Sequence, residues 1–370
     1  MKINLTKKDL VKFQRIVDMK YLNMEADDFF SDYLQNDYLS VTSEDMTDLI
    51  KCQAMSKKDA FLTAWLMNKD ISPEDPEILR MKDEGFFDKI DCLNDIHYKK
   101  NLFSDSLRIQ EKSEGSWALS YNYYQPYEGF LYDDLYSNPN HYFSERNSIG
   151  FFERKVPYLV LKENDIIWMS ITPFEINTMK KPIEQAHGNV ITFGLGLGYF
   201  AYMAINNSNV DHVTIIEKDK KAIKIFENEI LPKIRLRNKL TILEMDAFDY
   251  AKEQMPLQHY DYAFFDIYHS ADDGIDSYIR MKKLESFSPR TEFTYWIENS
   301  MLALLRRYVI TLMEENLNGY SDPDYQIATN KEEKLLNKIY SALKDKEFKT
   351  YEEIHDFLLD ENLKRLAKSI

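Results

Sequence analysis

Apolar residues recur along the chain at two different spacings. In residues 1 to about 105 they return every three or four positions, as at Phe13, Ile16 and Val17. This is the period of a helix that buries one face. We therefore predict a helical N-terminal domain over residues 1–110.

The next segment, 111–180, is rich in aromatic residues and lacks that helical period. Two strand-like runs, 156–161 and 166–171, flank a polar loop and predict a β-hairpin lead-in. Thr172 and Pro173 suit the first turn of a helix that continues to about Ala186, with Gly188 as its stop. The aromatic stretch could wall an acceptor pocket, although such stretches more often form core packing. The candidate pocket residues are Tyr121, Tyr123, Tyr124, Tyr127 and Tyr132.

Short apolar runs then alternate with helical patterns through residues 181–320. The predicted strands are 190–193, 213–216, 240–243, 262–265 and 294–298. Such alternation indicates an α/β fold with a doubly wound, mostly parallel sheet. A short extended piece is expected around 325–328, and residues 321–370 are predicted to form a helical C-terminal extension.

Composition narrows the possible partners and locations. The 370 residues carry 62 Asp and Glu against 47 Lys and Arg, a net charge of −15, which makes a nucleic-acid partner unlikely. The densest basic run, 218–239, is expected to be a solvated helix face. No apolar stretch approaches 18 residues and no secretory signal is visible, so we expect neither membrane insertion nor export. Two distant cysteines, Cys52 and Cys92, favour a reducing, cytoplasmic location and no metal site.

Three of the ten glycines fall within five residues, directly after one predicted strand and before a helix. These are Gly194, Gly196 and Gly198. Glycine allows a sharp turn and close approach of a ligand, and the following helix start offers unpaired N–H groups. The alternative is a tight turn that binds nothing.

Acidic residues follow the next three strands. Glu217 ends the second strand, Asp246 follows the third with Ala247 beside it, and Asp266 follows the fourth. The carboxyl ends of parallel strands share one edge, where open α/β sheets bind ligands. Glu217 is well placed to accept hydrogen bonds from a ribose. Glu298, at the end of the fifth strand, is a further candidate for this edge.

These motifs resemble class I S-adenosylmethionine-dependent methyltransferases, and within them the spermidine-synthase-like branch, over about residues 189–300. The resemblance implies a Rossmann-like methyltransferase core that binds S-adenosylmethionine. It places the loop of Gly194, Gly196 and Gly198 under the amino-acid part of the cofactor and Glu217 on the ribose. It places Asp246 and Ala247 at the adenine, and Asp266 beside the methionine end. The family usually has an acid two residues before the first glycine, where this chain has Thr192.

The reacting groups are less well marked. Asp266, Tyr268 and His269 could orient an acceptor and take its proton, and solvent exposure or helix capping is the alternative for His269. The hypothesis is methyl transfer by in-line displacement to an unknown acceptor, with a small molecule favoured.

Three alternatives stay open. The first is a cofactor-binding or scaffold protein without activity, since a fold does not guarantee a reaction. The second is an NAD-dependent oxidoreductase, because residues 196–201 also fit a dinucleotide loop. The third is an aminopropyltransferase-like enzyme, although the glycine- and aspartate-rich loop of that group is missing.

Overall fold

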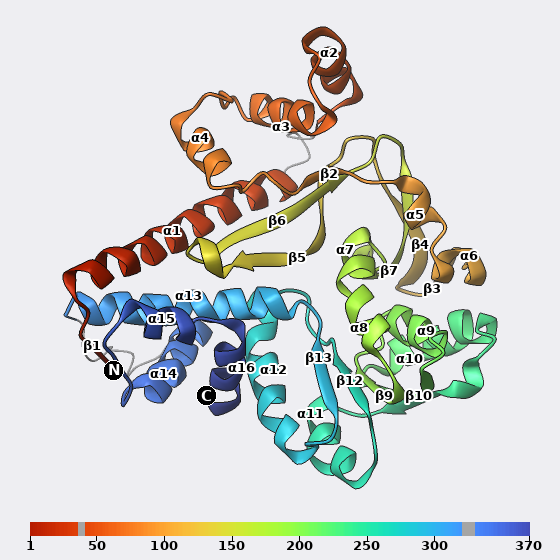
Figure 1. Cartoon of the computed structure of the whole chain (residues 1–370). Coiled ribbons are helices and arrows are strands. Elements are labelled where there is room, and N and C mark those ends of the chain that lie inside the picture. The colour runs from red at the N-terminus through yellow and green to blue at the C-terminus, as the bar shows by residue number, and fades with distance from the viewer. Residues whose placement is uncertain (36–40, 320–329) are drawn as a thin grey trace.

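A computed structural model describes residues 1–35, 41–319 and 330–370 (Figure 1). Its α/β part is built on a five-stranded sheet in the order β11-β10-β9-β12-β13. All neighbouring strands in this sheet run parallel, which confirms the predicted fold class. The strands are β9 (Gly188–Phe193), β10 (Val210–Glu217), β11 (Leu240–Glu244), β12 (Tyr262–Phe265) and β13 (Glu292–Tyr295).

The chain enters this sheet at its centre and winds outward in both directions. It runs from β9 to β10 and β11, then returns to β12 on the other side of β9. The order therefore reverses between β9 and β12, and such switch points are where open α/β sheets bind ligands. Thr192 and Phe193 are fully buried here, as is all of β12, because helices cover both faces.

Helices lie on the two sides of the sheet in Figure 1, with α8, α9 and α10 on one side and α11 and α12 on the other. Residues 226–233 continue α10 as irregular helical turns, as residues 250–257 continue α11. The helices of this part are α7 (Pro173–Thr178), α8 (Lys180–Gln185), α9 (Tyr199–Ile205), α10 (Lys220–Ile225), α11 (Ala247–Asp249), α12 (Ala271–Leu284) and α13 (Glu298–Leu317).

The N-terminal region is mainly helical, as predicted, but two short strands were missed. β1 (Lys2–Ile3) pairs with β14 (Glu347–Phe348), and β2 (Ile90–Cys92) pairs with β6 (Ser144–Phe151). Each strand is too short to show a period of its own in the sequence. The helices are α1 (Lys7–Gln35), α2 (Ser43–Gln53), α3 (Lys57–Asn68), α4 (Pro76–Asp83), α5 (Asp95–Lys99) and α6 (Leu102–Leu107).

Two further sheets lie between this region and the parallel sheet. One has the order β2-β6-β5, and the other is antiparallel in the order β3-β4-β7-β8. The predicted hairpin is confirmed as β7 and β8, joined by Asn164 and Asp165, which both adopt positive φ. The new strands are β3 (Lys112–Glu114), β4 (Trp117–Tyr124), β5 (Phe130–Asn138), β7 (Val156–Glu163) and β8 (Ile166–Ser170).

The helix expected from Thr172 to Ala186 begins as predicted but is broken. Thr172 caps α7 and forms a capping box with Glu175, and the chain then starts a second helix, α8, after Met179. The prediction for Gly188 was wrong, because α8 already ends at Gln185. Gly188 opens β9 with a φ of +59°, and a Cβ there would lie 2.2 Å from Oδ2 of Asp261.

The C-terminal helices pack beside α1 and α12, and α1 lies along α13 (Figure 1). Arg307 of α13 forms ion pairs with Asp27 of α1 and with the buried Glu145 of β6. The helices are α14 (Lys331–Leu343), α15 (Tyr351–Phe357) and α16 (Asp360–Ser369). The extended piece predicted at 325–328 lies outside the described residues. In the part of the chain that is described, no helix is both long and apolar enough to cross a membrane. The domain boundaries at 110, 180 and 320 stay predictions.

Candidate functional site

The three glycines form the turn between β9 and α9. All adopt positive φ, at +99° for Gly194, +54° for Gly196 and +79° for Gly198. A Cβ on Gly194 would lie 1.8 Å from the carbonyl oxygen of Asp266, and one on Gly198 would lie 2.2 Å from Cε2 of Phe226. A Cβ on Gly196 would meet nothing within 4 Å. The first and third glycines are therefore required by packing, whereas Gly196 borders open space.

Glu217, at the end of β10, is bonded to this turn. Its Oε2 accepts a hydrogen bond from the amide of Leu195 at 3.1 Å, and its Oε1 accepts one from the amide of Asp219 at 2.8 Å. Each carboxylate oxygen can accept more than one hydrogen bond, so Glu217 keeps acceptor capacity for hydroxyl groups.

Asp246 lies beyond the next strand and caps α11. Its Oδ1 accepts from the amides of Phe248 at 2.9 Å and Asp249 at 3.2 Å. Ala247 is buried beside it, and the amide of Met245 donates to the carbonyl of Glu217 at 3.0 Å. The structure thus brings the ends of β10 and β11 together.

Asp266 follows β12 directly, and its amide donates to the carbonyl of Phe193 at 2.9 Å. Its side chain is half-buried, and among the described residues none donates a hydrogen bond or ion pair to its carboxyl group. Burial, together with the carboxylates of Glu175 and Glu217, raises the pKa of Asp266 to about 8. Such a group favours a positively charged neighbour.

Glu175, in the first turn of α7, is an acid that the sequence did not single out, and its carboxylate contributes to the raised pKa of Asp266. Its Oε2 accepts from the amide of Thr172 at 2.9 Å, and burial raises its pKa to about 7. The Thr172-to-Glu175 capping box was visible in the sequence. Glu175 is far from Asp266 in the sequence, so the effect of its charge on Asp266 could not be predicted from the sequence.

Asp134 of β5 is a second acid that the sequence did not single out. It accepts from the amide of Asn299 at 3.0 Å and from the hydroxyl of Ser300 at 2.6 Å, at the start of α13. Burial raises the pKa of Asp134 to about 6, although these hydrogen bonds lower it. Besides burial, the carboxylates of Asp266, Glu298 and Asp134 all help to raise the pKa of Tyr268.

Tyr268 and His269 have different environments. Tyr268 is buried, and its hydroxyl donates to the carbonyl of Trp296 at 2.7 Å. Burial and nearby carboxylates raise the pKa of Tyr268 far above its usual value, so its hydroxyl stays protonated. His269 is exposed, and its amide donates to Asp273 at the start of α12. The described contacts give Tyr268 a packing role, and a catalytic role for either residue stays a prediction.

Two other sequence candidates lie elsewhere. Glu298 does not end a strand, because β13 stops at Tyr295; Glu298 opens α13, accepts from Tyr278 at 2.9 Å and pairs with Lys364 at 3.1 Å. The aromatic candidates have different environments: Tyr123 is exposed, and the hydroxyl of Tyr132 donates to Asp91 at 2.6 Å. Tyr124 is buried against Phe130 and Tyr158.

The geometry can be tested against a nucleoside cofactor from these residues alone. Open space at Gly196, unused acceptor capacity on Glu217 and the unpaired carboxyl group of Asp266 suit a ribose and a cationic group. The site residues therefore fit S-adenosylmethionine. Within the described ranges, no group of three or more His, Cys, Asp or Glu could hold a metal ion.

No protein-family model and no curated protein match the sequence. Among solved structures, the chain is similar to a conserved hypothetical protein from Streptococcus pyogenes, with 21% identity and a TM-score of 0.24, over 28% of this chain and 61% of that one. It is also similar to spermidine synthase from Thermotoga maritima, with 11% identity and a TM-score of 0.28, over 41% of this chain and 59% of that one. A third similar structure is MnmC2 from Aquifex aeolicus, with 14% identity and a TM-score of 0.27, over 68% of this chain and 76% of that one. The chain spans about three fifths of the first two proteins.

Proposed function

We propose that this protein is an S-adenosylmethionine-dependent methyltransferase of the class I type. The observation that carries the proposal is the hydrogen bond between Leu195 and Glu217, which joins the glycine turn to the acid at the end of β10. Asp246 and Asp266 follow the two neighbouring strands at the same edge. A glycine turn followed about 20 residues later by an acid suits binding of a ribose at a switch point, and the two further acids match the resemblance to this family.

Each residue would have a separate role. Glu217 would accept hydrogen bonds from the ribose, Asp246 and Ala247 would contact the adenine, and the glycine turn would carry the amino-acid part. Bound S-adenosylmethionine supplies an electrophilic methyl group. Asp266 and Glu175 would hold positive charge at the methionine end, and the protein would mainly orient the acceptor and exclude water.

Calorimetry with S-adenosylhomocysteine tests the proposal. Saturable one-to-one binding by the wild-type protein is the expected result, and Glu217→Gln should weaken it. Asp211→Asn is a matched control, since Asp211 lies at the opposite end of the same strand and is exposed. Absence of binding at high micromolar ligand would end the proposal. Binding without any methylated product from a broad acceptor panel would favour the inactive alternative.

Aminopropyl transfer is a second candidate, favoured by the raised pKa values of Asp134, Glu175 and Asp266. Buried carboxyl groups suit an acceptor that carries several amines, because an ammonium group favours their charged form. The two reactions leave different products from the donor: methyl transfer leaves S-adenosylhomocysteine, and aminopropyl transfer leaves methylthioadenosine. Mass spectrometry after incubation with S-adenosylmethionine or its decarboxylated form would distinguish them.

A further inference from the structure

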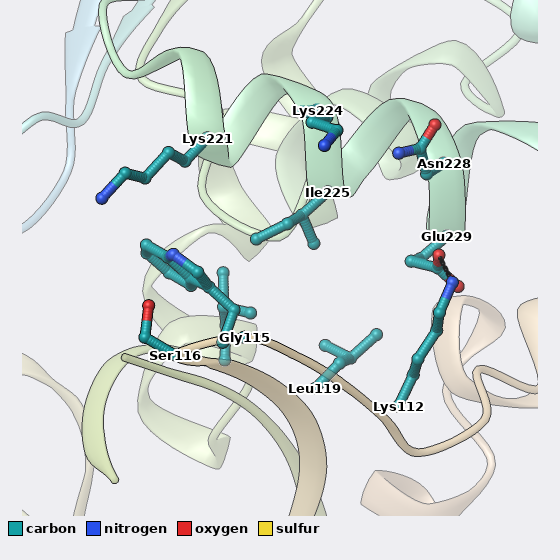
Figure 2. A pocket seen from close by; sticks show the side chains of 11 residues that line it. Lys112, Gly115, Ser116, Leu119, Lys221, Lys224, Ile225, Asn228 and Glu229 are labelled. Carbon is teal, nitrogen blue, oxygen red and sulfur yellow. Dashed lines mark hydrogen bonds and ion pairs between the residues drawn. The ribbon is translucent and has the colours of Figure 1, made fainter. Parts of the chain in front are cut away.

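A cavity of about 340 Å³ lies between α10 and the antiparallel sheet of β3, β4, β7 and β8 (Figure 2). Its apolar wall contains Trp117, Leu119 and Leu161 from the strands and Ile225 from the helix. None of the glycine-turn residues, nor Glu217, Asp246 or Asp266, lines it. The cavity is therefore separate from the site proposed above, and its volume falls within the range of small-molecule pockets.

The charge of the lining is opposite to that of the protein. Lys112, Lys221 and Lys224 line the cavity, and among the described side chains of its lining Glu229 is the one carboxylate. The whole chain has a net charge of −15. A local excess of lysines in so acidic a protein favours a negatively charged ligand.

The lysines already have partners, but Lys112 and Lys221 are themselves exposed to solvent. Lys221 pairs with Glu163 at 3.2 Å, and both side chains reach solvent. Lys112 pairs with Glu229 across the cavity, as Figure 2 shows by their facing side chains. Exposed ion pairs of this kind contribute little stability, so a ligand anion can compete for the same ammonium groups.

The apolar part favours an aromatic ligand. The ring of Trp117 forms part of the lining, and Nζ of Lys221 lies 5.9 Å from its centroid. An aromatic ring can therefore pack on Trp117, Leu119 and Leu161 while its acidic group reaches the lysine. We propose that this cavity binds an aromatic anion, a flat ring system that carries a carboxylate or a related acidic group. This inference does not depend on the proposed methyl transfer.

Calorimetry with 2-naphthoate tests the inference, with 2-naphthol as the uncharged probe of the same shape. We expect saturable one-to-one binding of 2-naphthoate and at least about tenfold weaker binding of 2-naphthol, since the charged group carries the lysine contacts. The double variant Lys221→Glu/Lys224→Glu should bind 2-naphthoate more weakly than the wild type, by a similar factor. Lys220→Glu is the matched control, because Lys220 lies on the same helix, pairs with Glu244 and does not line the cavity.

Any one of four results would overturn the inference. Three of them are no saturable binding of 2-naphthoate, equal binding of the two probes, and equal weakening by the double variant and by Lys220→Glu. Competition between 2-naphthoate and S-adenosylhomocysteine would also overturn it, because the two ligands would then share one site. Thermal unfolding of each variant, compared with wild type, shows whether a lost signal comes from lost folding. If the double variant unfolds, Lys221→Gln and Lys224→Gln, made singly, replace it.

Discussion

The amide of Leu195 donates a 3.1 Å hydrogen bond to Oε2 of Glu217, and this bond joins the glycine turn after β9 to the end of β10. The two elements are adjacent in the parallel sheet, so the turn and the acid are fixed relative to each other by the register of their strands. A ligand that contacts both would meet a preformed arrangement, which lowers the entropic cost of binding.

Replacement of Glu217 by glutamine should weaken nucleoside binding more than it weakens folding. The amide oxygen can still accept from Leu195, but the charge that strengthens bonds from ribose hydroxyls is lost. Hydrogen bonds to charged groups contribute about 1.5–3 kcal/mol, so we expect roughly 10- to 100-fold weaker binding of S-adenosylhomocysteine. Calorimetry measures this change. Unchanged affinity would show that Glu217 serves only the turn.

Gly196 and Gly115 form a matched pair for testing the glycine turn. Both have positive φ, at +54° and +62°, and a Cβ on either would meet nothing within 4 Å. Replacement by alanine should therefore cost each about 1 kcal/mol of unfolding free energy, because only backbone strain is added. Of the two variants, only Gly196→Ala should also weaken the binding of S-adenosylhomocysteine. Equal binding by the two variants would contradict a ligand at this turn.

The stability of the protein should fall as pH rises toward 8. Asp266 has a folded pKa of about 8, above its usual value of 3.8, so the folded state holds the proton that the unfolded state releases between these values. The contribution of Asp266 to the stability of the fold is therefore fully present below its unfolded pKa of 3.8, and it is lost as pH rises through its folded pKa of about 8. In Asp266→Asn the free energy of unfolding should depend less on pH. Relative to the wild type, the variant should be more stable at pH 8 than at pH 5 by on the order of 2 kcal/mol.

Denaturant unfolding at several pH values checks this prediction. Glu285→Gln is a suitable control, since ion pairs with Lys282 and Lys368 outweigh burial and lower the pKa of Glu285. That variant should lose stability at neutral pH instead of gaining it. A decline that persists unchanged in Asp266→Asn would show that another group holds the proton.

Tyr268→Phe should destabilise the fold, because the variant leaves the carbonyl of Trp296 without the buried hydroxyl that now donates to it at 2.7 Å. An unsatisfied buried acceptor costs about 1–3 kcal/mol. Thermal unfolding measures the loss. If the variant keeps wild-type turnover once folded, Tyr268 packs the site; a large fall in kcat with unchanged stability would instead assign it a catalytic role.

Much of the α/β core was predictable because its signals are local. The strands are continuous apolar runs such as Tyr262–Phe265, and all four residues of that run are buried. The glycine turn was predictable because three glycines within five residues directly follow a strand and precede a helix. The contacts with Asp266 and Phe226 that require Gly194 and Gly198 are distant in the chain and were not predictable. The hairpin of β7 and β8 was similarly marked by its own turn residues.

The remaining differences come from contacts that no local pattern carries. β2 exists only because β6 pairs with it, and Glu298 belongs to α13 because the chain turns at Ile297 with a φ of +45°. Glu175 of α7 acts electrostatically on Asp266, and Asp134 of β5 accepts hydrogen bonds at the start of α13. Neither acid is near Asp266 in the chain.

The sequence by itself determined the strands of the core, the tight turn after β9 and the presence of an acid after each of three strands. It could do so because strand burial, backbone conformation and the shared edge of parallel strands follow from short stretches of residues. The tertiary structure alone decided that Asp266 has no cationic partner among the described residues, and that lysines of α10 face Trp117 across a cavity. These properties depend on burial and on the distance between charges, which only the packing of separate segments sets.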